Sequence, residues 1–262
     1  PWEPKNYDGK FEGPMALHTA LAKSKNMVSI RVLQAVGTQN AQDWITRFGF
    51  EAEKHPAYLT MALGAGSVTP MQMATAYSVF ANGGYRVNPW LIAKVTDQKG
   101  KVLAEASAPK LDESVRAVDT RNAFIMNRLL QEVARSGTAA KAQATLKRTD
   151  LYGKTGTTND HNQTWFVGYT PQLSTAVSIG NVIPADEQTR RAYTLNGKCF
   201  GIYRCQGNVF GGTIAAPVWG KIMAQASEGM PVVDFTNPSP TVVNGEQVTI
   251  PRVAGMTQAQ AI

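Results

Sequence analysis

Two short groups of polar residues have the types and spacing needed for chemistry. The run from Gly153 to Thr157 places a cation, two hydroxyls and two side-chain-free positions within one short stretch. A lysine with neighbouring hydroxyls can bind and orient a carboxylate, and a glycine lets another backbone approach closely. Ser24-Lys25-Asn26 combines a hydroxyl that could relay a proton with an amide that donates and accepts hydrogen bonds. The alternatives are a helix-capping serine and a turn-forming asparagine, and such short motifs also occur by chance.

The flanking patterns predict which elements carry these groups. Apolar residues at helical spacing predict helices over 15–21 and 27–36, so Ser24-Lys25-Asn26 falls in the connection between them. Runs rich in β-forming residues at 151–158, 164–169 and 173–182, separated by turn residues, predict a meander of antiparallel strands. Lys154 would lie on the first of these strands.

The rest of the chain predicts further helices and a hairpin. Thr69-Pro70-Met71-Gln72 has the pattern of a capping box, and a helix should follow it up to Asn82. Further helices are predicted over 121–135, capped by Thr120, and over 216–226, and a hairpin over 92–104. The predicted fold class is α+β, an antiparallel sheet flanked by helices.

Composition narrows the function classes. The net charge of +7 is spread along the chain, without the basic stripe and interleaved aromatics of a nucleic-acid groove, so no nucleic-acid partner is predicted. The sequence contains no stretch of eighteen apolar residues, which is the length needed to span a bilayer. His18 and His55 lack metal-ligand spacing, and neither a metal nor a cofactor is predicted.

The two cysteines are Cys199 and Cys205, in a stretch rich in Gly, Asn and Arg. Their short spacing could close a small loop by a disulfide in an oxidising compartment. Two free thiols are the alternative, and no accompanying His or Cys pair points to zinc.

The two polar groups, in this order, resemble the second and third signature motifs of the penicillin-binding proteins and serine β-lactamases. Other stretches resemble the transpeptidases in particular: Trp2 to Tyr7, Leu63-Gly64, Thr69 to Ala74, Gly137-Thr138-Ala139, Trp165 to Pro171 and Ala216 to Trp219. The resemblance covers about residues 1–230 and is closest to the bifunctional class A penicillin-binding proteins. It implies a penicillin-binding/serine β-lactamase-like fold with a helical subdomain.

One motif of that family is missing. Its Ser-x-x-Lys nucleophile lies several tens of residues before the Ser-x-Asn motif, whereas only 23 residues precede Ser24. The literal match from Ser107 to Lys110 lies after Ser24 and contains Pro109, which disrupts the helical turn that would join serine and lysine. The nucleophile is therefore predicted to lie in an upstream segment outside this chain.

The resemblance implies a D,D-transpeptidase that cross-links the cell wall through a serine acyl-enzyme and is inhibited by β-lactams. Ser24 would relay a proton to the departing amine, and Asn26 would orient the substrate's peptide carbonyl. Lys154 would attract the terminal carboxylate. This chain alone would be inactive, and its parent would also be a peptidoglycan glycosyltransferase.

The strand would supply the remaining contacts. A hydroxyl of Thr155 or Thr157 would fix the position of the carboxylate, and Thr157 is favoured. The backbone N–H of Thr157 would help form an oxyanion hole. Gly156 would leave room for the substrate backbone. Since side chains on a strand alternate, these residues cannot all share one face. Lys25 and His161, beside the motifs, could line the cleft, but they are interpreted as solvent-facing polar residues, the usual case at such positions.

Two other functions remain open: a wall-peptide-binding scaffold without catalysis, and a D,D-carboxypeptidase. The implied partners are peptidoglycan stem peptides, β-lactams, the upstream nucleophile segment and the cell-wall synthesis machinery. The implied location is the extracytoplasmic face of the plasma membrane, with an upstream anchor.

The C-terminal region differs in composition. A run rich in Pro, Asn, Ser and Thr follows Met230, so a transpeptidase domain is predicted over 1–233 and a linker over 234–247. Residues 248–262 are too few to form a core and resemble the beginning of a PASTA module.

Overall fold

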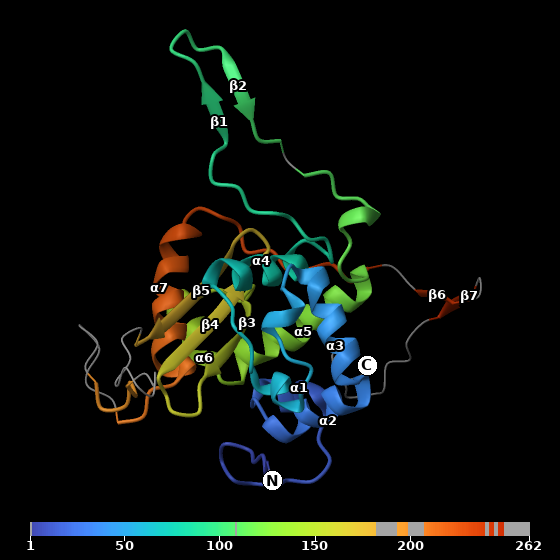
Figure 1. Cartoon of the computed structure of the whole chain (residues 1–262), viewed down its shortest axis with the longest axis vertical. Coiled ribbons are helices and arrows are strands. Elements are labelled where there is room, and N and C mark those ends of the chain that lie inside the picture. Colours follow the sequence, from blue (N-terminus) through green and yellow to red (C-terminus); the bar gives the residue numbers. More distant parts are fainter. Residues whose placement is uncertain are drawn as a thin grey trace.

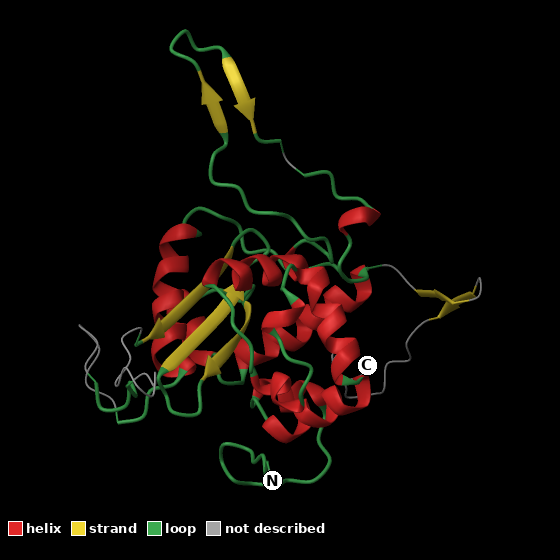
Figure 2. Cartoon of the chain, in the orientation of Figure 1, coloured by secondary structure: helices red, strands yellow, loops and turns green. Residues whose placement is uncertain are grey.

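The computed structural model describes residues 2–107, 109–181, 193–198, 207–238, 241–243 and 246–248. Its centre is an antiparallel sheet in the order β3-β4-β5, made of Tyr152–Thr157, Gln163–Tyr169 and Ser174–Gly180. Helices lie on both faces of this sheet (Figure 1, Figure 2). The prediction of an α+β fold with an antiparallel sheet flanked by helices is confirmed.

The helices, 3₁₀ turns and one π-helical turn (η5) are, in chain order, α1 Leu17–Ala22, α2 Asn26–Val36, α3 Thr38–Ile45, η1 Thr46–Phe48, η2 Ala52–Lys54, η3 Leu59–Leu63, α4 Pro70–Ala81, η4 Glu113–Val115, α5 Thr120–Arg135, α6 Ala140–Leu146, η5 Gly211–Ala215 and α7 Ala216–Ala226. Every predicted helix is present. The short helices α3 and α6 were not predicted.

Two helix starts show how local sequence determines the ends of these elements. Thr69 accepts a hydrogen bond from the backbone of Gln72, whose side chain in turn accepts from the backbone of Thr69, so the predicted capping box of α4 is confirmed. The predicted cap of α5 is wrong by one residue. Asp119, rather than Thr120, accepts the hydrogen bond from the backbone of Arg121, since a carboxylate there reaches the free N–H groups.

One face of the sheet packs against α4 and α5. Tyr152 of β3 and Tyr169 of β4 are stacked with ring centroids 5.3 Å apart, and neither is exposed to water. The Tyr169 hydroxyl donates to the side chain of Asn127 on α5, so this buried polar group is paired. Packing on this face fixes the start of β3 against α5.

The other face packs against α6 and α7. Phe166 of β4 and Trp219 of α7 meet edge to face with centroids 5.1 Å apart, and both are fully buried. The Trp219 indole N–H donates to the backbone of Thr175 on β5. Both faces of the sheet are thus covered, and β3, which lies at one side of the described sheet, keeps an edge that pairs with no described strand.

The predicted hairpin is present as β1 Lys94–Thr96 and β2 Val102–Glu105, and it projects away from the body of the molecule (Figure 1). Every residue of both strands is exposed. The first strand begins two residues later than predicted, and the second keeps its predicted length but starts one residue later. No other element covers either side of this ribbon, so only local pairing holds it.

The segment after α7 runs back over the body of the molecule. Asp234 forms an ion pair with Arg128 of α5 at 2.8 Å and accepts a hydrogen bond from the Tyr152 hydroxyl at 2.5 Å. The ring of Phe235 packs against Tyr152 with centroids 4.9 Å apart. Packing against the domain therefore continues through Phe235, slightly beyond the proposed end at residue 233.

The C-terminal predictions reach the limit of the described chain. β6 Thr241–Val243 lies in the proposed linker and pairs with β7 Glu246–Val248, which ends at the first residue of the proposed PASTA-like segment. Apart from Val248, the proposed PASTA-like segment 248–262 lies outside the described residues, as do Cys199 and Cys205.

Candidate active site

The α1–α2 connection and strand β3 meet through two side chains. The Lys154 ammonium donates a hydrogen bond to the Ser24 hydroxyl, with 2.8 Å between Nζ and Oγ. Lys154 also donates to the backbone oxygen of Thr155 at 3.1 Å. Residues far apart in the sequence therefore form one polar centre between the helices and the sheet edge.

The end of α1 explains how Ser24 reaches this position. Ser24 has a φ of 54°, in the left-handed region that glycine normally occupies after a helix. Its backbone N–H donates to Leu21, and the next N–H, of Lys25, donates to Ala20. These are the two hydrogen bonds of a Schellman motif, so helix termination directs the serine hydroxyl toward β3. A serine in this conformation is strained relative to glycine.

Lys25 does not face solvent, so that interpretation is wrong. Its side chain is only 5% exposed, and its ammonium lies 2.7 Å from an Asp8 carboxylate oxygen and 2.8 Å from one of Glu12. A buried ammonium is stable when paired in this way. No local pattern announces this contact, because both carboxylates come from an irregular N-terminal segment.

Asn26 is the first residue of α2 and is bound from the same N-terminal segment. Its side-chain amide donates to the backbone oxygen of Lys5 at 2.9 Å. Asn6, itself buried, accepts a hydrogen bond from the backbone of Met27 at 3.1 Å. The amide of Asn26 is thus oriented by a segment that the motif itself does not include.

Lys154 has an unusual electrostatic environment. It is largely surrounded by protein, and loss of hydration lowers its pKa to about 8. Among the residues that the structure describes, no carboxylate forms an ion pair with it. A cation held without a counter-ion can attract an anionic ligand.

Thr155 and Thr157 project to the opposite face of β3 from Lys154. The Thr155 hydroxyl lies 2.6 Å from that of Thr138, and the Thr157 hydroxyl accepts a hydrogen bond from the backbone of Gly211 at 3.0 Å. The expected alternation of side chains along this strand is therefore present. Because the Thr157 hydroxyl accepts from Gly211, its own proton is available to a ligand.

Close backbone packing supports the end of β3. A Cβ atom on Gly211 would lie 2.3 Å from the Trp165 oxygen and 2.5 Å from the Gly156 oxygen. Only glycine fits there, so η5 can pack directly on the strand beside Thr157. Gly211 and Thr138 were not predicted as site residues. Gly137-Thr138-Ala139 resembles the transpeptidases, but no site role was predicted for Thr138. The glycine pair Gly211-Gly212 is the sequence signal from which close packing of two backbones could have been predicted.

Three aromatic rings lie beyond Thr157. Phe210, just before Gly211, packs edge to face with Tyr7 at 5.3 Å and with His161 at 4.9 Å between centroids. The Nδ1 atom of His161 lies 2.8 Å from the Val209 oxygen, so this side chain is partly buried rather than free in solvent. The N-terminal segment therefore contacts both the Ser24 side and the β3 side of the site.

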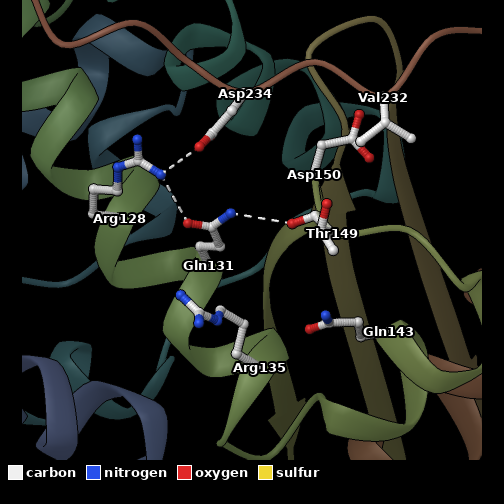
Figure 3. Close-up of a pocket in the computed structure, with 8 residues that line it drawn as sticks. All are labelled: Arg128, Gln131, Arg135, Gln143, Thr149, Asp150, Val232 and Asp234. Carbon is white, nitrogen blue, oxygen red and sulfur yellow. Dashed lines mark hydrogen bonds and ion pairs between the residues drawn. The ribbon is translucent and has the colours of Figure 1, made fainter.

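A separate cavity of about 290 Å³ lies between α5, α6 and the C-terminal segment (Figure 3). Much of its polar lining is already paired. Arg128 bonds Asp234 and Gln131, and Gln131 donates to the Thr149 backbone, as the dashed lines show. The cavity contains neither Ser24 nor Lys154, so it is not the site described above.

Comparison with known proteins identifies the family. Residues 1–200 match the penicillin binding protein transpeptidase domain. The chain belongs to the penicillin-binding protein transpeptidase family. It is 45% identical over 249 residues to penicillin-binding protein 1A of Neisseria flavescens, covering 94% of this chain and 29% of that protein. It is therefore part of a class A penicillin-binding protein, the class that its sequence resembles, and spans less than a third of this relative.

Solved structures agree with the fold. Penicillin-binding protein 1A from Haemophilus influenzae superimposes with a TM-score of 0.76 at 28% identity, covering 90% of this chain and 38% of that one. PonA1 from Mycobacterium tuberculosis, solved in complex with penicillin V, gives 0.69 at 23% identity, covering 95% and 65%. The fold predicted from the resemblance is confirmed. Within the described ranges, no helix is long and apolar enough to cross a bilayer.

Proposed function

We propose that the chain forms two walls of a peptidoglycan D,D-transpeptidase site. The observation that carries this proposal is the 2.8 Å contact between Lys154 and Ser24, which joins the two polar motifs into one centre. The nucleophilic serine and its lysine would come from a segment upstream of this chain. Its oxygen would attack the amide carbonyl of a D-Ala-D-Ala stem peptide, break the carbon–nitrogen bond and release D-alanine.

Ser24 is suited to supplying the leaving group with a proton. Its oxygen already accepts a hydrogen bond from Lys154, so its own hydrogen can point toward the departing nitrogen. A neighbouring ammonium also makes the hydroxyl a better acid. The acceptor amine of a second stem peptide would later attack the ester, form the cross-link and free the serine.

Lys154 and Thr157 are suited to binding the terminal carboxylate of the donor peptide. Lys154 has no described carboxylate partner, and Thr157 is exposed with a hydroxyl proton to donate. Thr155, by contrast, shares its hydroxyl with Thr138, which favours Thr157 as the direct contact. Since the two side chains leave opposite faces of β3, the carboxylate would lie at the free edge of the strand, where Lys154 could reach it from one face and Thr157 from the other. Charge-assisted hydrogen bonds of this kind would give both affinity and orientation.

The free edge of β3 would receive the extended peptide. No described strand pairs with this edge, and Gly156 presents no side chain to it. The backbone N–H of Thr157 would form one half of the oxyanion hole, and that of the upstream serine the other. Asn26, fixed by the Lys5 carbonyl, would orient the peptide carbonyl.

The parent protein would act at the extracytoplasmic face of the plasma membrane, held by an upstream anchor, and would also carry glycosyltransferase activity. Its partners would be stem peptides, β-lactams and the cell-wall synthesis machinery. This chain without the upstream segment would form no acyl-enzyme, because the attacking oxygen is supplied by that segment.

The test uses the full-length protein and a fluorescent penicillin. We expect a covalent adduct on an upstream Ser-x-x-Lys serine, mapped by peptide sequencing, and much slower labelling in the Ser24→Ala and Lys154→Met variants. Absence of an adduct on the folded protein would instead support a wall-peptide-binding scaffold. Stem peptides distinguish the two enzymes, since D-alanine release without cross-links would indicate a carboxypeptidase.

A further inference from the structure

Lys25 is buried in a way that surface lysines of this chain are not. Its side chain is 5% exposed, compared with 49% for Lys54 and 48% for Lys94. Moving an ammonium out of water is unfavourable unless carboxylates replace the hydration. Lys25 has two such partners, Asp8 and Glu12, and both remain partly exposed at 44% and 41%.

The two carboxylates belong to residues 5–12, which we call the brace segment. This segment contacts each position after Ser24 in turn: Asp8 and Glu12 bind Lys25, the Lys5 carbonyl binds Asn26, and Asn6 binds the backbone of Met27. Contacts so closely spaced leave the start of α2 little freedom to move relative to the brace segment.

The turn that carries Ser24 has a particular need for such support. Ser24 lies in the left-handed conformation that glycine adopts without strain, and other residues hold it only where surrounding contacts impose it. The backbone N–H of Lys25 donates to Ala20 and closes this turn. Lys25 therefore stabilises the turn by its main chain and anchors it by its side chain.

The brace segment also reaches the facing wall. The ring of Tyr7 packs on Phe210, and the next residue, Gly211, donates its N–H to the Thr157 hydroxyl. Because Tyr7 precedes Asp8 directly, the ion pair with Lys25 and the aromatic contact with Phe210 are made by adjacent residues. One short segment thus connects the wall of Ser24 with the wall of Thr157.

We propose that Lys25 is a positioning residue: through the brace segment it holds Ser24 in the turn that keeps the serine hydroxyl within hydrogen-bond distance of Lys154. This inference rests on the proposed transpeptidase function. Lys25 itself touches neither substrate nor reacting atoms, because its ammonium is enclosed by Asp8 and Glu12.

The experiment measures the second-order rate of acylation of the full-length protein by a fluorescent penicillin. Lys25→Met keeps the length of the side chain and removes its charge, and we expect acylation to slow about tenfold or more through misplacement of Ser24. Lys25→Arg restores a cation that can bind both carboxylates, and we expect a rate within about threefold of the parent. This rescue separates positioning by charge from a general loss of structure.

Lys54→Met is the matched control. Lys54 also contacts a carboxylate at 2.8 Å, that of Glu51, but both side chains are about half exposed and far from Ser24 in the sequence. We expect its acylation rate to change by less than about twofold, since exposed ion pairs contribute little.

Acylation of Lys25→Met within twofold of the parent would overturn the proposal, and so would equal slowing in Lys25→Met and Lys25→Arg with unchanged melting temperatures. If Lys25→Met does not melt cooperatively, Asp8→Asn takes its place. Glu12 still neutralises the Lys25 ammonium in that variant, so we expect acylation to slow by only about threefold. A parent protein that forms no adduct contradicts the proposed function, whereas a labelled parent with an equally fast variant contradicts only the role of Lys25.

Discussion

Lys25 and Lys154 lie on the two walls of the same site, and both are largely withdrawn from water, yet their surroundings are opposite. The ammonium of Lys25 donates hydrogen bonds to Asp8 and to Glu12. Both raise its pKa above the usual value, and the bond to Asp8 has the larger effect. The ammonium of Lys154 meets only a hydroxyl and a carbonyl oxygen, and its burial lowers the pKa to about 8. The first charge is neutralised within the protein, whereas the second is available to an incoming anion.

The difference shows how one residue type serves two purposes. A lysine surrounded by carboxylates holds chain segments together, because its charge is fully used by them. A lysine buried without carboxylates raises the free energy of the folded protein and recovers that energy when an anionic ligand binds. Changes at each wall should therefore affect stability and acylation differently.

Lys154→Met should have the largest effect on acylation. Without the ammonium, neither the carboxylate of a penicillin nor the Ser24 hydroxyl has its partner, and a loss of about a hundredfold to a thousandfold is expected. Stability should not fall, because an unpaired buried charge is removed. Lys94→Met on the exposed hairpin is the control. A folded Lys154→Met protein that is acylated at the parent rate would show that the comparison between the two lysines has no functional meaning.

Ser24→Ala should come next. Loss of the proton donor is expected to slow acylation about a hundredfold, the usual contribution of general acid catalysis. Non-covalent affinity for the same penicillin, obtained from the saturation of the rate, should change much less, because Lys154 remains. A weaker affinity with an unchanged limiting rate would assign Ser24 to binding instead of proton transfer.

Gly211→Ala should disturb the wall of Thr157. Its Cβ would overlap the Trp165 and Gly156 oxygens, so η5 must move away and take the Thr157 contact with it. We expect acylation to slow about tenfold to a hundredfold through this displacement. Gly207→Ala is the control, because a Cβ at that position meets nothing within 4 Å. Equal rates for the two variants would show that η5 does not support the site.

Acylation should also depend on pH through Lys154. With a pKa of about 8, most of this side chain is charged at pH 7 and little of it at pH 9, so the second-order rate should fall about tenfold between them. Stability should respond in the opposite direction. The pKa of Lys154 in the folded protein lies below the usual lysine value of 10.5, so the unfolded chain binds more protons between about pH 8 and 10.5, and this group makes stability rise with pH there. A Lys154→Arg variant should show neither change.

The smallest expected effect concerns the turn itself. The free energy of unfolding in urea should be about 1 kcal/mol higher for Ser24→Gly than for Ser24→Ala, since glycine adopts the left-handed conformation without strain. Both variants should be equally slow in acylation, because each lacks the hydroxyl. Equal stability of the two would mean that the turn at residue 24 is not strained.

Local rules predicted much of this fold. The capping box at Thr69, the meander carrying Lys154 and the amphipathic α5 each follow from neighbouring residues, and so could be inferred from the sequence. Lys25 could not be placed, because its partners Asp8 and Glu12 lie in a segment without regular structure. The orientation of Thr155 toward Thr138 was equally hidden, since alternation along a strand shows which residues share a face but not what that face meets.

The tail after α7 has a practical consequence for anyone shortening this protein. Phe235 covers Tyr152, whose hydroxyl bonds Asp234, and Tyr152 lies two residues before Lys154 on the same strand. Truncating the protein before Phe235 would expose the ring of Tyr152 to water and make β3, the strand that carries Lys154, less stable. Versions intended for crystallisation or inhibitor screening should therefore end after Phe235, even though the composition changes several residues earlier.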